Sequence, residues 1–183
     1  AIRRAYRNAL SIEQVRNGER PYWYEYLKPD VRAEDLDWKT FAKGRTTKAF
    51  DPILYSAWYG YWEFSQGPVP QWAVHFLDTA HFIADLGIPE SCVCLGGVYT
   101  WKDAHGFTAP DQVQALWQYP EGLMISYTTN FGKSAGDMIR YCGDKGTLKL
   151  GWEDATFSAD GGIHRDGSIR GENKVEPIEQ TDH

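Results

Sequence analysis

Two tight-turn signals in the second half of the chain limit its fold more than any other feature. The turns are Pro120-Glu121-Gly122 and Asp144-Lys145, and each falls between two segments rich in β-favouring residues. The flanking segments are 112–119, 123–130, 137–143 and 146–152. Short connections of this kind favour chain reversal, so each pair predicts a β-hairpin.

Further β-favouring segments extend this run of strands. They are 91–101, 155–159 and 174–179, with a glycine-rich and charged stretch at 160–173 that we expect to be an exposed loop. The first half of the chain reads differently. It predicts helices at 3–17 and 35–44, an aromatic strand at 21–27 and an ordered loop at 45–66, with a turn of helix as the alternative for part of that loop.

One long helix is expected at 67–87. Pro68 and Pro70 suit a helix start, where a missing N–H is tolerated, and Gly87 with Pro89 suits its end. A single long helix followed by successive strands predicts an α+β domain: a mainly antiparallel open sheet with helices on one face. The uncovered face of such a sheet favours self-association, so we expect a homo-oligomer through the sheet.

A polar stripe runs along this otherwise apolar helix. On an ideal α-helix Gln71, His75, Asp78 and Phe82 share one sector, flanked by apolar sectors. Polar groups that face a core are costly unless bonded. Either His75 and Asp78 bond to each other and to a loop, or the stripe faces a substrate pocket in which His75 exchanges a proton.

A metal site on this helix is not expected. His75 and His81 would point about 120° apart on an ideal helix, so they would not converge on one ion. Neither H-E-x-x-H nor C-x-x-C occurs, and the three cysteines, Cys92, Cys94 and Cys142, read as small buried hydrophobes.

Charge and composition exclude several partners. The formal net charge of −6 gives no electrostatic reason to bind nucleic acid, and no apolar run is long enough to span a membrane. None of the 18 glycines forms Gly-x-Gly, so a dinucleotide-binding loop cannot be drawn. The chain starts at "AIRRAYRNAL" without a signal-peptide pattern, which leaves localisation open, with the cytoplasm as the default expectation.

Several ordered segments together resemble a known family. They are "LDWKTFAKGRTTKAFDP", "FDPILYSAWYGYWEFSQGPVPQWAVHFLDTAHF", "CLGGVYTWKD", "APDQVQALWQYPEGLMISYTTNFG" and "GDKGTLKL". In content, order and spacing they are similar to the glucose–fructose oxidoreductase / inositol dehydrogenase (Gfo/Idh/MocA) family. The resemblance covers about residues 1–150.

The resemblance implies a fold and a place in a larger enzyme. Residues 1–183 would be the C-terminal substrate-binding and oligomerisation domain of a two-domain dehydrogenase, of the glyceraldehyde-3-phosphate-dehydrogenase-like kind. Residues 1–20 would form a connecting helix from a missing N-terminal domain. NAD or NADP would be bound mainly by that domain, and the family's catalytic lysine would also lie there.

The same resemblance implies the chemistry and its residues. Family members transfer a hydride between NAD(P) and a sugar, cyclitol or related polyol, and His75 occupies the position of the histidine that takes the hydroxyl proton. Four places earlier the family typically has Asp, where this chain has Gln71. Glutamine can orient a hydroxyl but cannot share a proton with His75, so Asp78 becomes the nearest acid to assist it.

Further residues are expected to bind substrate. Tyr59, Trp62 and Lys102 can line the same pocket, with the aromatic rings against the apolar side of a sugar. The alternatives are core packing for the rings and a surface ion pair of Lys102 with Asp103. For the whole chain, the alternative to an oxidoreductase half is a non-catalytic ligand-binding or dimerisation module of the same fold, which the departure at Gln71 favours.

Overall fold

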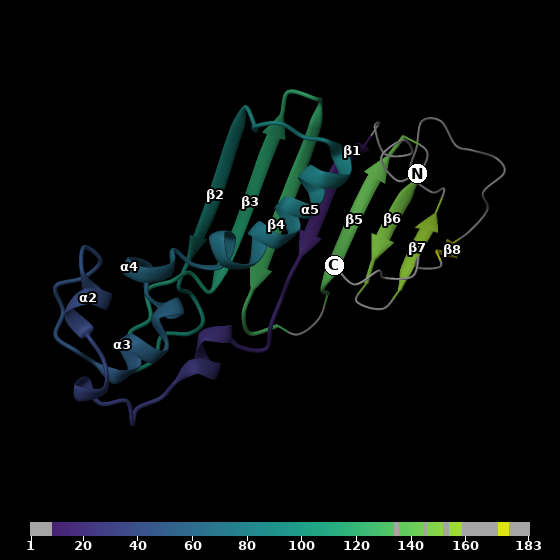
Figure 1. Ribbon diagram of the computed structural model, residues 1–183. Helices are drawn as coiled ribbons and strands as arrows, with labels where there is room; N and C mark the ends of the chain where they lie inside the picture. The colour runs from purple at the N-terminus through teal and green to yellow at the C-terminus, as the bar shows by residue number, and fades with distance from the viewer. Residues whose placement is uncertain (1–8, 134–135, 145, 152–153, 159–171, 176–183) are drawn as a thin grey trace.

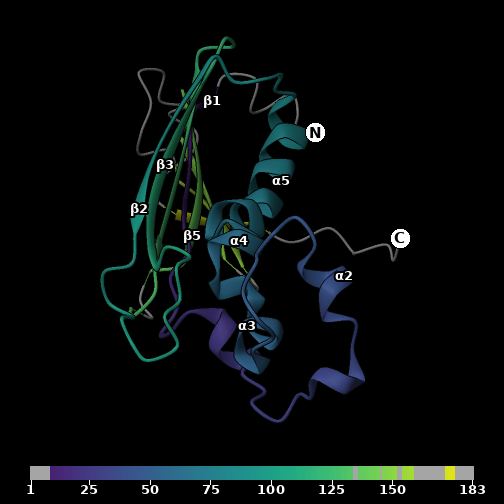
Figure 2. The same cartoon turned by 90° about the vertical axis from the view of Figure 1, so that its left-hand side faces the viewer.

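The protein folds into one open, twisted sheet with its helices gathered on one face. The structure, a computed structural model, describes residues 9–133, 136–144, 146–151, 154–158 and 172–175. Among these residues eight strands form one sheet in the order β2-β3-β4-β1-β5-β6-β7-β8 (Figure 1). Viewed from the side, helices α2 to α5 all lie on the same side of the sheet (Figure 2). The predicted α+β class with helices on one face is therefore confirmed.

The strands follow the predicted hairpins closely. Their bounds are β1 Ala9–Val15, β2 Ser91–Gly97, β3 Gln112–Tyr119, β4 Leu123–Asn130, β5 Met138–Gly143, β6 Thr147–Leu150, β7 Ala155–Ser158 and β8 Glu172–Val175. β1 pairs in parallel with β4, and every other neighbouring pair is antiparallel. The first hairpin turns at Gly122, whose φ of 81° favours glycine and whose N–H donates to the Tyr119 carbonyl. Most of the loop expected at 160–173, and residues 176–179 of the last predicted strand, lie outside the described residues.

The helical elements are short except for one. They are the 3-10 helices η1 Tyr22–Tyr26, η2 Ala33–Asp35 and η3 Trp58–Gly60, and the α-helices α2 Trp38–Ala42, α3 Pro52–Ser56, α4 Trp62–Ser65 and α5 Val74–Ala84, with a π-helical turn, η4 Val69–Ala73, directly before α5. The helix expected at 35–44 is present in part, as α2, and η2 ends where it was expected to begin. The region 45–66, expected to be a loop, contains α3, η3 and α4, and Asp51 caps α3 by accepting the N–H groups of Ile53 and Leu54.

The helix predicted at 3–17 is wrong over its described part, which is strand β1. This strand lies between β4 and β5 in the middle of the sheet, with Ile12 opposite Ile125 and Tyr141. Glu13 and Arg140 also form an ion pair across β1 and β5. Pairing with two strands more than a hundred residues away outweighs the local helical preference.

The strand predicted at 21–27 is also wrong, because this segment is the 3-10 helix η1. The Pro21 carbonyl accepts the N–H of Tyr24 and so closes a tight turn. Trp23 is then almost completely buried between Phe107 and Phe131. The aromatic residues that suggested a strand instead supply rings to a compact cluster.

The helix predicted at 67–87 is confirmed in its middle and shorter at its end. It opens with Pro68 and Pro70 as expected, but its first turn is π-helical. Asp85, rather than Gly87, ends α5 by adopting a left-handed conformation in which its N–H donates to the His81 carbonyl.

Two apolar clusters hold these parts together. One lies between α5 and the sheet, where Phe76 and Ala80 pack against Trp117 and Ile125. The other joins η1, α3 and η3 to the lower end of the sheet and includes the buried rings of Trp23, Phe107 and Phe131.

The prediction that all three cysteines are buried is wrong for Cys92 and Cys94, which are exposed. They lie opposite the buried residues Trp117 and Ala115, so they point to the helix side of the sheet. Because β2 is an edge strand, the helices do not cover its side chains. Cys142 in β5 is half-buried.

No helix among the described residues covers the other face of the sheet. Val93, Leu95, Leu116 and Met124, on β2, β3 and β4, expose between 41% and 74% of their surface. No helix in the described part of the chain is long and apolar enough to cross a membrane.

Candidate active site

A cleft of about 450 Å³ lies beside the first turn of α5. Helix α5 contributes His75, Phe76 and Thr79 to its wall, and the π-helical turn η4 contributes Trp72. The sheet contributes Gln14 and Arg16 from β1 and its end, Ile139 and Tyr141 from β5, and Leu150 from β6. This size is within the range of pockets that hold small organic ligands.

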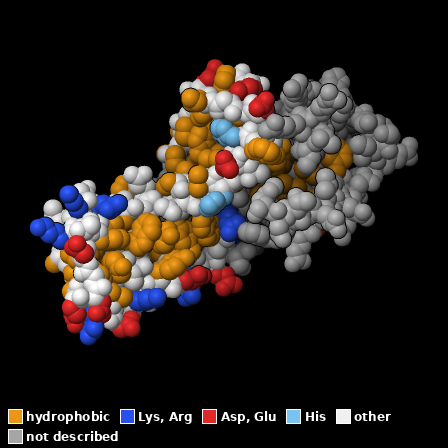
Figure 3. All heavy atoms as spheres, in the orientation of Figure 1, with side chains coloured by type: hydrophobic (Ala, Val, Ile, Leu, Met, Phe, Trp, Pro, Cys, Tyr) orange, Lys and Arg blue, Asp and Glu red, His pale blue; other side chains and the backbone are white. Residues whose placement is uncertain are grey.

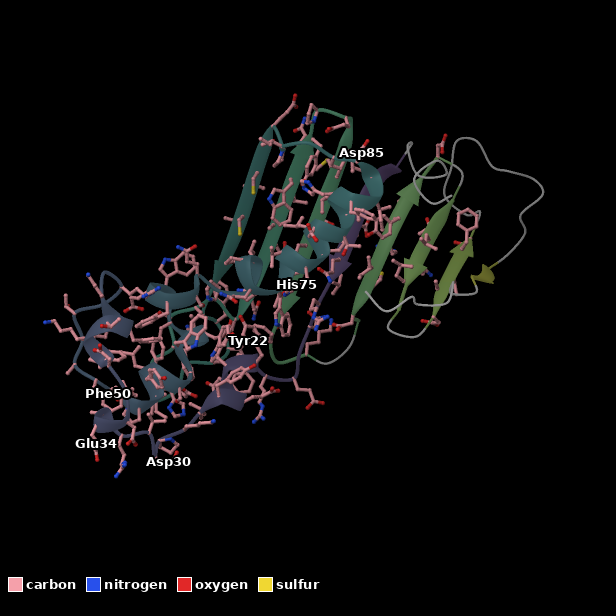
Figure 4. The ribbon with its side chains drawn as sticks, in the orientation of Figure 1. Tyr22, Asp30, Glu34, Phe50, His75 and Asp85 are labelled. Atoms are coloured by element: carbon pink, nitrogen blue, oxygen red, sulfur yellow. The ribbon has the colours of Figure 1, made fainter. Side chains whose placement is uncertain are left out.

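His75 stands in this cleft with an open imidazole. The residue is exposed, and its ring has no hydrogen-bond partner within the described ranges. Its backbone carbonyl accepts the hydroxyl of Thr79, one turn further along the helix. Figure 4 shows His75 at the start of α5, with Asp85 at the opposite end of the helix. The imidazole is therefore available to a ligand in the cleft.

The π-helical turn separates Gln71 from the stripe that an ideal helix predicted. Gln66 and Gly67 have left-handed backbone angles that reverse the chain after α4. The wider turn then leaves the Gln71 amide close enough to donate to the Ser65 carbonyl, at 3.4 Å. Gln71 thus bonds back to the preceding turn and does not line the cleft with His75.

Asp78 and His81, also on α5, do not line this cleft. Asp78 is exposed and makes no hydrogen bond to His75 in the part of the chain that the structure describes. The Nε2 atom of His81 lies 2.7 Å from the Tyr119 hydroxyl, on the side of the helix that faces the sheet. The described residues contain no group of three or more His, Cys, Asp or Glu side chains placed to hold a metal ion.

Trp72 forms a rigid wall of the cleft. The Arg16 guanidinium lies 4.6 Å from the centre of its ring, and Tyr22 stacks on it with ring centres 4.9 Å apart. Phe131 also contacts the indole edge-on. Tyr22 lies in η1, next to the start of α5 (Figure 4). These contacts fix the indole and bring one positive charge to the cleft that contains His75.

The phenols around the cleft remain neutral at ordinary pH. Burial raises the pKa of Tyr141, which lines the cleft, to about 12. Burial also raises the pKa of Tyr127 to about 12 and moves that of Tyr22 further up still. The Tyr141 hydroxyl is thus a hydroxyl group and not a phenolate in this cleft.

The other predicted binding residues lie outside this cleft. Tyr59 stacks on Trp58 with ring centres 3.9 Å apart and contacts Tyr22 edge-on. It therefore packs against the apolar cluster that contains Trp23. Trp62 is about half exposed on α4. Lys102 is exposed on the loop after β2, and the neighbouring Asp103 accepts the Tyr24 hydroxyl. On the face that carries the helices, apolar side chains gather over the region of α3 and α4 and beside α5 (Figure 3).

Sequence reasoning missed Gln14 and Arg16 because it placed them in a helix. As a strand, "SIEQVR" alternates, with Ile12, Gln14 and Arg16 turned to the helix side of the sheet. Both faces of the segment carry polar residues, so the alternation has no clear hydrophobic signal.

Comparison with known proteins agrees with this architecture. Residues 39–149 match the GFO/IDH/MocA C-terminal domain family. This chain belongs to that family. Its members are oxidoreductases. A search of curated proteins finds no match to the sequence.

Several solved structures share the fold of this Gfo/Idh/MocA domain at low sequence identity. A Thermotoga maritima protein classed as an oxidoreductase has a TM-score of 0.60 at 12% identity, covering 98% of this chain and 44% of that one. An aldose-aldose oxidoreductase from Caulobacter crescentus, complexed with glycerol, has a TM-score of 0.59 at 10% identity, covering 98% and 43%. A levoglucosan dehydrogenase in complex with NADH and levoglucosan has a TM-score of 0.59 at 11% identity, covering 94% and 41%. The chain thus spans less than half the length of each.

Proposed function

We propose that this Gfo/Idh/MocA domain is the substrate-binding half of an NAD(P)-dependent oxidoreductase that acts on a sugar, cyclitol or related polyol by hydride transfer. The observation that carries the proposal is the open imidazole of His75 in a cleft of about 450 Å³. Family membership and the fold shared with sugar-acting dehydrogenases support it.

In this proposal His75 takes the proton of the reacting hydroxyl. A neutral imidazole accepts that proton as the hydride leaves the same carbon. Because His75 is exposed, the proton can pass on to solvent. Trp72, held by Arg16 and Tyr22, limits the positions that a ring in the cleft can take. Gln71, Asp78, Tyr59, Trp62 and Lys102 remain predicted substrate-binding residues, of which Asp78 is the acid one helix turn from His75.

The nicotinamide cofactor would be held mainly by another part of the full-length protein. A pyrophosphate is usually bound by free N–H groups at a helix start. Here the turn that precedes α5 opens with Pro68 and Pro70, which have no N–H, and the chain contains no Gly-x-Gly. The described residues therefore fit the substrate side of the reaction and not the pyrophosphate. When bound, the cofactor would supply the nicotinamide ring that accepts the hydride.

We also propose that the uncovered sheet face joins copies of the full-length protein. Val93 and Leu116 are cross-strand neighbours on that face, and Leu95 and Met124 lie beside them. Exposed apolar side chains clustered on a sheet favour a contact that removes them from water.

A non-catalytic binding or assembly module is the competing function. Residue 71 favours this function, because it is a glutamine and not an acid. Its amide bonds to the Ser65 carbonyl and does not assist His75. The two functions differ in one assay: the full-length protein is incubated with NAD⁺ or NADP⁺ and a panel of sugars and cyclitols, and nicotinamide absorbance is followed. We expect reduction with at least one polyol. Absence of reduction across the panel, with binding intact, would leave only the module.

A further inference from the structure

Gln14 carries a buried polar group that nothing in the described part of the chain satisfies. The residue is only 6% exposed, on the inward face of the central strand β1. Its Oε1 atom is fully buried and has no hydrogen-bond partner among the described residues. The same side chain lines the cleft that contains His75.

The surroundings of Gln14 make this arrangement costly without a ligand. The neighbouring cleft walls include Phe76, Ile139 and Leu150, whose side chains cannot donate a hydrogen bond. A buried carbonyl oxygen without a donor is destabilising, and a methionine of similar length would fill the same space without that penalty. Because Oε1 is closed off from solvent, the terminal amide of Gln14 must turn toward the cleft that its side chain lines, and a donor that enters the cleft then removes the penalty.

We propose that Gln14 binds a second hydroxyl of the substrate, distinct from the one that reacts at His75. This inference rests on the proposed function and names a feature of its substrate class. The substrate is a polyol whose non-reacting hydroxyl reaches the sheet side of the cleft, with C–H surface against Phe76 and Ile139. An amide can accept from such a hydroxyl or donate to it.

The proposal predicts discrimination against deoxy analogues. A site built to bond a hydroxyl rejects the analogue that lacks it, because the buried group is again left unsatisfied. One polyol that binds the full-length protein is compared with its set of singly deoxygenated analogues. One of these analogues lacks the non-reacting hydroxyl that bonds Gln14. That analogue should bind about 10- to 100-fold more weakly than the parent polyol.

The test compares Gln14→Met with Gln114→Met in the full-length protein. Gln114 is exposed on the outer sheet face, so its variant is the matched control. Gln14→Met should weaken binding of the parent polyol about 10- to 100-fold and leave binding of the critical deoxy analogue within about threefold. The unfolding temperature of the unliganded variant should not fall. The control, which lies on the opposite face of the sheet from the cleft, should match the parent protein in polyol binding and in turnover.

Equal weakening for both ligands, or no weakening for either, would overturn the role of Gln14. Binding is measured by calorimetry and turnover by nicotinamide absorbance, so the two proposals can fail separately. Polyol binding that depends on Gln14 without any hydride transfer would contradict the proposed function and support this inference. If Gln14→Met transfers hydride and keeps the parent protein's preference for the polyol over its deoxy analogue, the proposed function holds and the role of Gln14 is wrong.

Discussion

At the scale of single residues, Asp111 shows how one buried acid shapes the loop beside the sheet. Its carboxylate is fully buried and accepts the N–H groups of Tyr99, Thr100 and Trp101 at 2.7 to 3.2 Å. These bonds end β2 at Gly97, so the strand predicted to run on to residue 101 stops early. No sequence pattern predicts these hydrogen bonds, because their donors are backbone N–H groups ten or more residues away from Asp111.

Replacing that acid should weaken the whole domain. Asp111→Asn keeps the shape but removes the charge and at least one acceptor, leaving buried N–H groups poorly satisfied. We expect the free energy of unfolding to fall by about 2 to 4 kcal/mol in urea titrations. Asp30→Asn, at an exposed site (Figure 4), should change it by less than about 0.5 kcal/mol. An equally small change in Asp111→Asn would show that these hydrogen bonds do not matter.

The residues of the cleft differ in how far sequence could predict them. His75 could be found from its place in a recognisable helix. Its open cleft could not, because the sheet wall comes from β1 and β5, which meet only in the fold. Gln71 shared a helical face with His75 only on an ideal helix, and the π-helical turn changed its direction.

At the scale of elements, the sequence predicted strands correctly where a tight turn joins two strands that pair with each other. The hairpin strands β3 and β4 begin and end where they were predicted, because Gly122 closes the turn between them. Prediction failed for β1, whose partners are distant in sequence, and for η1, whose rings pack in a cluster. Those two errors hid the sheet side of the cleft and the ring that stacks on Trp72.

Helix α5 lies close to the sheet because small residues face it. Ala80 of α5 and Ala73 of the preceding turn η4 are completely buried there. Ala80→Leu should force the helix outward and reduce the free energy of unfolding by about 1 to 3 kcal/mol, measured by urea titration. Val74→Leu, on the exposed side of the same helix, should change it by less than about 0.5 kcal/mol. Equal stability of the two variants would contradict this packing.

At the scale of the whole molecule, the helices cover one sheet face and leave the other open. The proposed reaction and the proposed assembly would therefore occupy opposite sides of the same sheet, with His75 on one and Leu95 and Leu116 on the other. The sequence predicted this division from strands followed by no further helix, and the described part of the chain agrees.

Charges on the open face should separate assembled copies. We expect Leu95→Glu with Leu116→Glu to lower the molecular mass of the full-length protein in sedimentation, because carboxylates would be buried in the contact. Ile88→Glu is the control, since Ile88 is 87% exposed in the turn before β2. If the double variant and the parent protein sediment alike, the sheet face is not the contact.

The most direct test of the central claim is the turnover of His75→Asn in the full-length protein, with His81→Asn as its partner on the same helix. If His75 takes the hydroxyl proton, its replacement should lower kcat by about 10²- to 10⁴-fold while the polyol still binds. His81→Asn removes only the bond to Tyr119, so it should lower stability and keep the turnover of the folded protein. A His75→Asn protein that reduces the cofactor as fast as the parent would show that this imidazole is not the proton acceptor.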